Sequence, residues 1–146
     1  MSKFLLNDGY VLIGTYDLSN YAYSLDTPSK KEQVDVSGFN STASKEYLPG
    51  PREDTITIGF LQDFTRGTAG PHSVLWTIYS TGATFTFDIR SVSPTTNSTV
   101  STTNPALRGT ASLYEYNGLS GQIGNRAEFN AVLKPAPNTF FTYQTS

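Results

Sequence analysis

The feature that most constrains this chain is an alternation of apolar and polar side chains that recurs along its length. Residues 83–90 read ATFTFDIR and residues 55–61 read TITIGFL, and in both segments every second side chain is apolar. Because successive side chains of a strand point to opposite faces of the sheet, each segment predicts a strand with one buried face. The side chains expected to face the core are Phe85, Phe87 and Ile89 in the first segment and Ile56, Ile58 and Phe60 in the second.

Shorter alternating segments extend this pattern over most of the chain, and the composition agrees with it. Aromatic residues make up 13% of the sequence and charged residues only 15%, against roughly 25% charged residues in typical soluble domains. Thr, Tyr and Phe favour pleated surfaces. We therefore expect a mainly β fold in a single domain, residues 1–146. Further strands are expected at residues 10–16, 21–25, 32–36, 109–116, 128–134 and 140–143.

One segment, PHSVLWTIYSTG at residues 71–82, departs from the alternation. It begins with Pro71 and ends with Gly82, the asymmetry expected of a helix. A further strand is the alternative, since Val, Trp, Ile and Tyr are good strand formers. The boundary signals favour a short helix. The side chains that share one face of such a helix are Leu75, Ile78 and Tyr79.

The sequence offers little catalytic or metal-binding chemistry. It contains no Cys, which excludes disulfides, thiolate nucleophiles and Cys-ligated metals. The one histidine, His72, is expected to be an exposed residue near the start of the helix. GLSGQIG at residues 118–124 lacks the Lys-Ser/Thr ending of a phosphate loop and predicts a flexible loop. The scattered carboxylates are expected to be solvated charges on strand faces: Asp17, Asp26, Asp35, Asp54, Asp63 and Asp88.

These observations exclude several classes of function. We expect no catalytic, cofactor or metal site and therefore no enzyme. The net charge of -2, without a basic stripe, does not indicate nucleic-acid binding. The N-terminus, MSKFLLNDGYVLIG, has apolar runs too short for a signal peptide or a membrane-spanning helix.

Two segments instead suggest contacts with other proteins. Residues 37–53 predict a long, turn-rich loop that runs directly into the strand at residues 55–61. The C-terminal arm, residues 135–146, begins with PAP and then carries NTFFTYQTS. Chain ends are usually polar, so an aromatic end needs a surface on which to pack. Packing on its own core and docking on a neighbouring copy remain equally open.

The segment VDVSGFNSTASKEYLPGPREDTITIGFLQDF resembles the central part of siphophage major tail proteins, the tail tube subunits of long-tailed bacteriophages. The matching motifs are VSGF at residues 36–39, YLPG at residues 47–50 and DTITIGF at residues 54–60. The later order is similar too, with a short helix followed by the strand FTFDIR. Pro51 departs from the pattern, because family members often have Leu or Met after the Gly.

The resemblance implies a two-sheet β-sandwich or partly closed barrel with one short flanking α-helix. It implies stacked hexameric rings that form a hollow tail tube in the virion, built in the host cytoplasm, through which DNA passes without specific binding. The implied partners are other copies of the chain, a tape-measure protein, a tail terminator and distal-tail or baseplate proteins, with no membrane and no cofactor.

Under this interpretation the candidate residues make contacts between subunits. The alternatives are another virion β-protein, such as a tail terminator, a connector or a capsid decoration protein, and a carbohydrate-binding β-sandwich. The last would use Trp76 and surface Tyr residues as stacking platforms, whereas we expect Trp76 to pack in the core. The candidate contact residues are Phe39, Lys45, Glu46, Tyr47, Leu48, Arg52, Glu53, Phe140, Phe141 and Tyr143.

Overall fold

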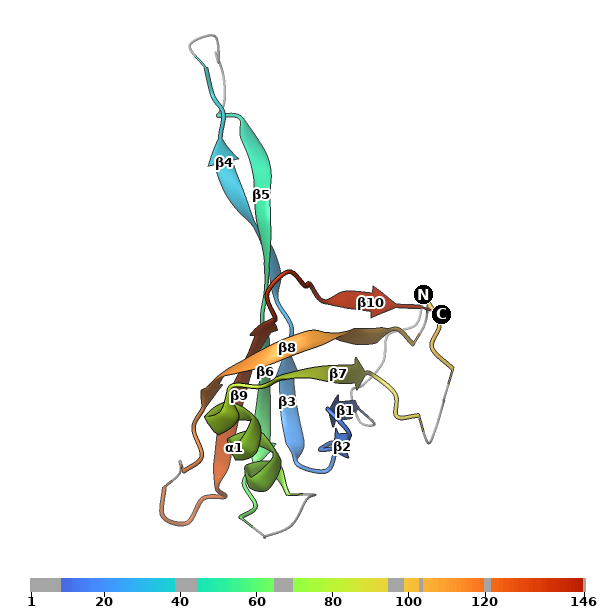
Figure 1. The fold of residues 1–146 in the computed structure, drawn as a ribbon, viewed down its shortest axis with the longest axis vertical. Coiled ribbons are helices and arrows are strands. Elements are labelled where there is room, and N and C mark those ends of the chain that lie inside the picture. The colour runs from blue at the N-terminus through green and yellow to red at the C-terminus, as the bar shows by residue number, and fades with distance from the viewer. Residues whose placement is uncertain are drawn as a thin grey trace.

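The computed structural model describes residues 9–38, 45–64, 70–94, 99–102, 104–119 and 122–145. Within them the chain forms a β-rich body from which one hairpin projects along the longest axis (Figure 1). The elements are β1 (Tyr10–Ile13), β2 (Tyr16–Asp17), β3 (Ala22–Asp26), β4 (Ser29–Asp35), β5 (Tyr47–Asp54), β6 (Ile56–Leu61), α1 (Pro71–Thr81), β7 (Thr84–Arg90), β8 (Ala106–Tyr116), β9 (Glu128–Pro135) and β10 (Thr142–Gln144).

The body is one antiparallel sheet of eight strands in the order β2-β1-β7-β8-β9-β6-β3, with β10 pairing β8 beyond the point where β9 ends. The sheet curls, so that Tyr10 and Val11 of β1 and Ala22 and Leu25 of β3 line one cavity of about 130 Å³ between its two ends. It is not closed into a barrel. The mainly β fold with two sheets and one short helix, expected from the sequence, is confirmed.

The core lies on the inner face of this curled sheet. The six alternating side chains of β6 and β7 expected there are all buried. Strand β9 adds Phe129, whose ring stacks on Phe60 at 5.4 Å between centroids. Fully burying a side chain of this size stabilises the fold by about 1.5–3 kcal/mol, so the strict alternation accounts for which face of each strand points inward. The other members of the core are Val11, Ile13, Leu18, Val74, Leu75, Leu107, Ala111, Ala131, Leu133 and Phe141.

Helix α1 has the boundaries that Pro71 and Gly82 predicted. Gly82 adopts the left-handed conformation at φ 69° and its N–H bonds Ile78 O at 3.1 Å, which ends the helix. The helix packs against β8 through one narrow side that includes Val74 and Leu75.

One expectation about this helix is wrong. Trp76 was expected in the core but is 49% exposed, and Tyr79, placed on the same face as Leu75 and Ile78, is 42% exposed. The reason is that only one narrow side of the short helix reaches the sheet, so side chains beyond it stay at the surface.

The projecting hairpin, called the arm from here on, consists of β4 and β5. Residues 47–53 were expected to be irregular loop and instead form most of β5, so that prediction is wrong. Pro49 and Pro51 are tolerated because the strand belongs to an isolated pair, and because Glu32 of β4 faces both Gly50 and Pro51 at a break in the register. A single residue, Thr55, separates β5 from β6. The arm is therefore a direct extension of a core strand.

Candidate assembly site

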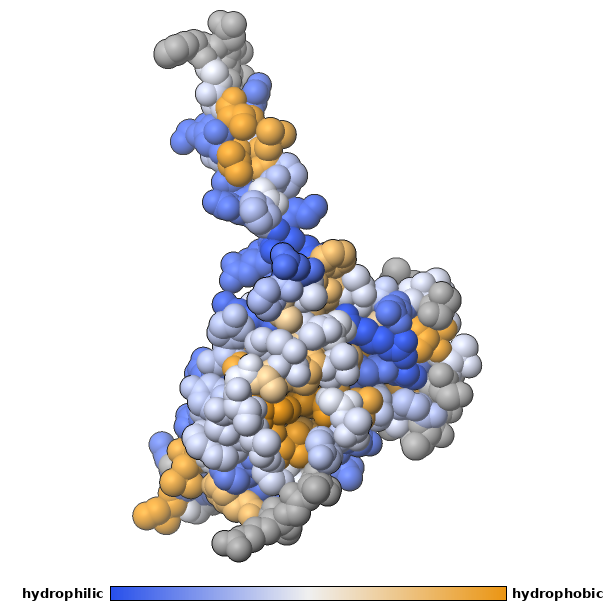
Figure 2. Space-filling model, viewed as in Figure 1, coloured by the Kyte–Doolittle hydropathy of each residue, from blue (hydrophilic) through white to orange (hydrophobic). Residues whose placement is uncertain are grey.

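The outer part of the arm carries apolar side chains that remain exposed among the described residues. Val34 pairs with Leu48 across the hairpin, and Val36 N–H bonds Glu46 O at 3.0 Å one step further out. Val34, Val36 and Leu48 are 42%, 42% and 57% exposed. They form the arm patch, the orange area on the projecting part of Figure 2. A two-stranded hairpin alone is marginally stable in water, so such a patch is suited to a partner surface.

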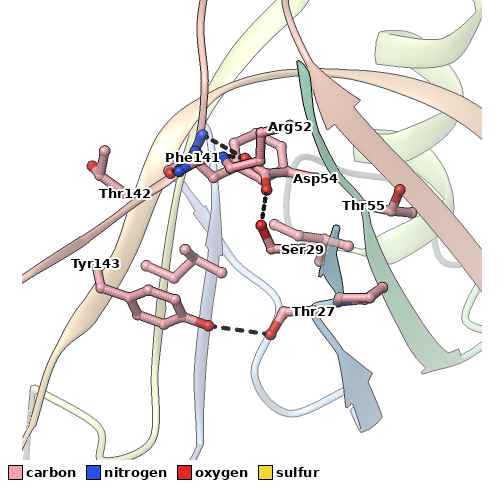
Figure 3. A pocket seen from close by; sticks show the side chains of 11 residues that line it. Thr27, Ser29, Arg52, Asp54, Thr55, Phe141, Thr142 and Tyr143 are labelled. Carbon is pink, nitrogen blue, oxygen red and sulfur yellow. Dashed lines mark hydrogen bonds and ion pairs between the residues drawn. The ribbon is translucent and has the colours of Figure 1, made fainter. Parts of the chain in front are cut away.

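The root of the arm is fixed by a buried carboxylate. Asp54, 6% exposed, accepts hydrogen bonds from Ser29 Oγ at 2.5 Å and from the Phe141 N–H at 3.3 Å. It also pairs with Arg52 Nη2 at 2.7 Å. These groups line a cavity of about 310 Å³ between the arm and the C-terminal segment (Figure 3). Asp54 was expected to be solvated, and the structure corrects this, because three donors satisfy it inside the fold.

The C-terminal segment divides its aromatic residues between the core and the surface. Phe141 is 5% exposed and meets Phe87 edge to face at 4.8 Å between ring centroids. Phe140 is 64% exposed under the guanidinium of Arg52, 5.0 Å from its ring centroid. Tyr143 is 62% exposed, with its hydroxyl 3.3 Å from Thr27 Oγ1. Within this chain, therefore, Phe141 packs on its own core while Phe140 and Tyr143 remain at the surface.

A second exposed cluster surrounds the start of α1. The His72 ring lies 4.8 Å from the Phe64 ring and stacks on Trp76 at 6.3 Å, and its Nδ1 is 2.6 Å from the Tyr116 hydroxyl. Trp76 lies 5.9 Å from Tyr79 and 6.1 Å from Tyr116. Phe64, Trp76 and Tyr79 are 50%, 49% and 42% exposed. These five residues form the aromatic patch.

Only a weak sign of this aromatic patch is visible in the sequence. His72 was expected to be an exposed cap residue and is instead partly buried between rings. Its contacts with Tyr116 come from a strand 44 positions away, which no local pattern reveals. The available signal was the pair Trp76 and Tyr79 on a helix without acidic or basic residues at its ends. Burial raises the pKa of the Tyr116 hydroxyl above its ordinary value of 10.0.

The remaining predicted contact residues lie along or beside the arm. Lys45 and Glu46 precede β5 and are exposed, Tyr47 is 50% exposed on the face opposite Leu48, and Glu53 pairs with Lys134 at 3.6 Å. Phe39 lies outside the described residues. The structure thus brings most of these residues onto one projection, and their role in contacts stays a prediction.

The expectation for a second carboxylate, Asp88, is also wrong, because it belongs to a polar cluster on the outer face of the sheet. Asp88 was expected to be solvated and is 13% exposed, 3.0 Å from Arg90 Nη2 and 3.1 Å from Arg108 Nε. Arg108 also bonds Gln144 of β10. This network ties the C-terminal strand to the sheet.

Among the described residues no group of three His, Cys, Asp or Glu side chains is arranged to hold a metal ion. No helix in that part of the chain is long and apolar enough to cross a membrane.

No protein-family model matches the chain, and no curated protein matches it by sequence. Solved structures do match. A chain of the SPP1 tail tube superposes with a TM-score of 0.68 at 10% identity, covering 99% of this chain and 81% of that one. The chain has the tail tube fold. The resemblance seen in the sequence is confirmed at the level of the fold.

Two structures of gene transfer agent (GTA) particles share this tail tube fold. A chain of the native GTA virion matches with a TM-score of 0.71 at 14% identity, over 96% of this chain and 99% of that one. A chain from the tail of an empty GTA particle, determined with C6 symmetry, matches with a TM-score of 0.61 at 16% identity, over 84% of this chain and 82% of that one.

Proposed function

We propose that this protein is a structural virion subunit that polymerises into the tail tube of a phage-like particle. The observation that carries the proposal is the match to the SPP1 tail tube over 99% of the chain. The C6 symmetry of the matching GTA tail supports rings of six subunits. Stacked rings of this kind enclose a channel, and we assign the channel to DNA passage.

The arm agrees with this function on physical grounds. It exposes an apolar patch on a projection that the other described residues leave uncovered. A contact between two different surfaces of identical subunits generates rings or filaments. We therefore assign the arm, including Lys45, Glu46, Tyr47 and Leu48, to contacts with neighbouring subunits. The exposed Phe140 and Tyr143 are further candidates for such contacts.

The remaining assignments follow from the same function. The subunit acts as scaffold rather than enzyme, is assembled in the host cytoplasm and resides in the virion tail. Its other partners are a tape-measure protein inside the tube, a tail terminator, and distal-tail or baseplate proteins at the far end.

Negative-stain electron microscopy of the purified protein at high concentration, with size-exclusion chromatography, tests the proposal. Hollow tubes or stacked rings are expected. A single closed ring that never stacks would instead indicate a tail terminator or connector, and a monomer at every concentration would contradict self-assembly. Deleting residues 43–48 should leave the monomer folded and prevent tube growth, and unimpaired tubes from this variant would refute the role of the arm.

A further inference from the structure

We propose that the arm patch of one subunit docks on the aromatic patch of a second copy of the chain, so that subunits join head to tail. This inference rests on the proposed tail tube function and names the two surfaces that meet.

The arm patch has the properties of the inserted partner. Val34, Val36 and Leu48 stand on a two-stranded ribbon whose residues are nearly all exposed. No second layer of the body lies over them (Figure 2). Removing these apolar side chains from water is favourable. Unless the arm folds back, a second molecule has to cover them.

The aromatic patch has the properties of the receiving surface. Helix α1, PHSVLWTIYST, contains no Asp, Glu, Lys or Arg, yet it exposes Trp76 and Tyr79. Depletion of charge together with exposed Trp and Tyr distinguishes the centres of protein interfaces from ordinary surface. Leu119 is also exposed, at 83%, and it follows Gly118, whose carbonyl accepts a hydrogen bond from the Gln62 side chain that also bonds the Tyr116 hydroxyl.

The two patches lie at opposite ends of the molecule. The arm projects from one end of the long axis and α1 lies towards the other (Figure 1). A chain therefore cannot satisfy its own arm patch with its own aromatic patch. A contact between unlike ends leaves one free arm and one free aromatic patch on every dimer. Further subunits can therefore be added at both ends, and assembly does not stop at the dimer.

The arm is also held in a fixed direction before it meets a partner. Asp54 joins Ser29 of β4 to Arg52 of β5 and to the backbone of Phe141. A projection held in this way loses less conformational freedom on docking than a loose loop. These bonds at Asp54 thus support docking by a preformed ribbon.

Cysteine cross-linking tests the inference directly, because the chain contains no natural Cys. Glu46→Cys places a thiol beside the arm patch, and Ser80→Cys places one on α1, one turn beyond Trp76. Both positions are exposed, and all residues of the two patches remain intact. Thr86→Cys, exposed on β7, serves as the control.

Mixing the Glu46→Cys and Ser80→Cys proteins with a short bis-maleimide should give covalent dimers, read on a denaturing gel. The amount of covalent dimer should be at least tenfold lower for each variant alone and for Glu46→Cys mixed with Thr86→Cys. A double Glu46→Cys, Ser80→Cys variant should give a ladder of higher multimers. Equal dimer formation by Glu46→Cys alone would show that arms pair with arms and would overturn the inference.

The outcomes separate this inference from the proposed function. If tubes form but the cross-linked dimer does not, the tube function is supported and the arm contacts a different surface of the neighbouring subunit. Cross-linked ladders without tubes would support the docking and contradict the tube. The absence of both would overturn both. A change in the fluorescence of Trp76, the one Trp in the chain, on adding oligosaccharides but not on self-association would assign the aromatic patch to glycans and overturn the inference.

Discussion

The side chains of Arg52 and Asp54 both bond the backbone of one residue, Phe141. The Arg52 guanidinium donates to the Phe141 carbonyl at 2.6 Å, the Phe141 N–H donates to the Asp54 carboxylate at 3.3 Å, and the two side chains pair at 2.7 Å. The pair therefore fastens the C-terminal segment to the root of the arm. This Arg52–Asp54 pair, called the bracket below, joins the arm to the segment that carries the exposed Phe140.

Replacing Asp54 with Ala should destabilise the fold. The change leaves Ser29 Oγ and the Phe141 N–H without their acceptor and Arg52 without its counter-charge. Breaking a buried pair costs about 3–5 kcal/mol, and the 36% exposure of the Arg52 side chain reduces this to about 2–3 kcal/mol. Urea unfolding followed by circular dichroism measures the loss.

Glu53→Ala is the matched control for this substitution. Its carboxylate pairs with Lys134 at 3.6 Å with the Glu53 side chain 72% exposed, so its removal should leave the unfolding midpoint unchanged. Equal effects of the two substitutions would show that the bracket contributes nothing beyond a surface ion pair.

Replacing Gly109 with Ala should loosen the C-terminal segment. An added Cβ would lie 2.9 Å from Phe141 Cδ1, and Phe141 is held between Phe87 and the bracket. Overpacking of this kind costs about 1–3 kcal/mol. Faster hydrogen exchange of the β10 amides, measured by mass spectrometry, would report the displaced strand.

Gly38→Ala provides the comparison for Gly109. Nothing lies within 4 Å of its added Cβ, so the unfolding free energy should stay within about 1 kcal/mol of the original or rise slightly. If Gly109→Ala behaves in the same way, the close approach of Phe141 to β8 is not required for stability.

The alternation in the sequence was sufficient to predict most of the body of the fold and, at residues 32–36, part of β4, but not β5 of the arm. Strands β6 and β7 were predictable because each buries one face, and Pro71 and Gly82 bounded α1. Residues 47–53 were misread because Pro and Gly indicate turns locally, whereas their pairing with β4 depends on a partner strand and on a bulge that accepts Pro51.

The candidate site was predictable in place but not in geometry. The aromatic C-terminus signalled a need for packing, but it did not reveal that Phe141, which lies against Gly109 of β8, enters the core while Phe140 stays exposed. Trp76 was misplaced for a related reason. Helical spacing gives the relative faces of α1 but not the width of the side that the sheet covers.

The turn beyond β4 should respond to acid. Hydrogen bonds from the backbone N–H and the side chain of Ser37 hold the pKa of the Asp35 carboxyl below 3.8. Because the folded pKa is lowered, the stabilisation is fully present above the unfolded value and is lost as the pH falls through the folded value. An NMR titration of the Asp35 carboxyl carbon should show a lower midpoint in the native protein than in urea.

Ser37→Ala separates the two contributions to that pKa. It removes the hydroxyl and keeps the backbone N–H bond, so the Asp35 midpoint should rise part of the way towards 3.8. An unchanged midpoint would assign the whole shift to the backbone donor.

Trp76→Ser and Leu75→Ala should separate assembly from folding within one helix. Leu75 is fully buried, and truncating it to Ala should cost about 2–5 kcal/mol. Trp76 is 49% exposed, so its replacement should cost much less stability. It should nevertheless abolish sedimentation of tubes at concentrations where the unaltered protein pellets, because interface centres depend on such aromatic anchors. Ultracentrifugation together with urea unfolding gives both quantities for each variant. Tubes that form normally with Trp76→Ser would show that the exposed face of α1 lies outside the subunit interface, whatever the stability of the monomer.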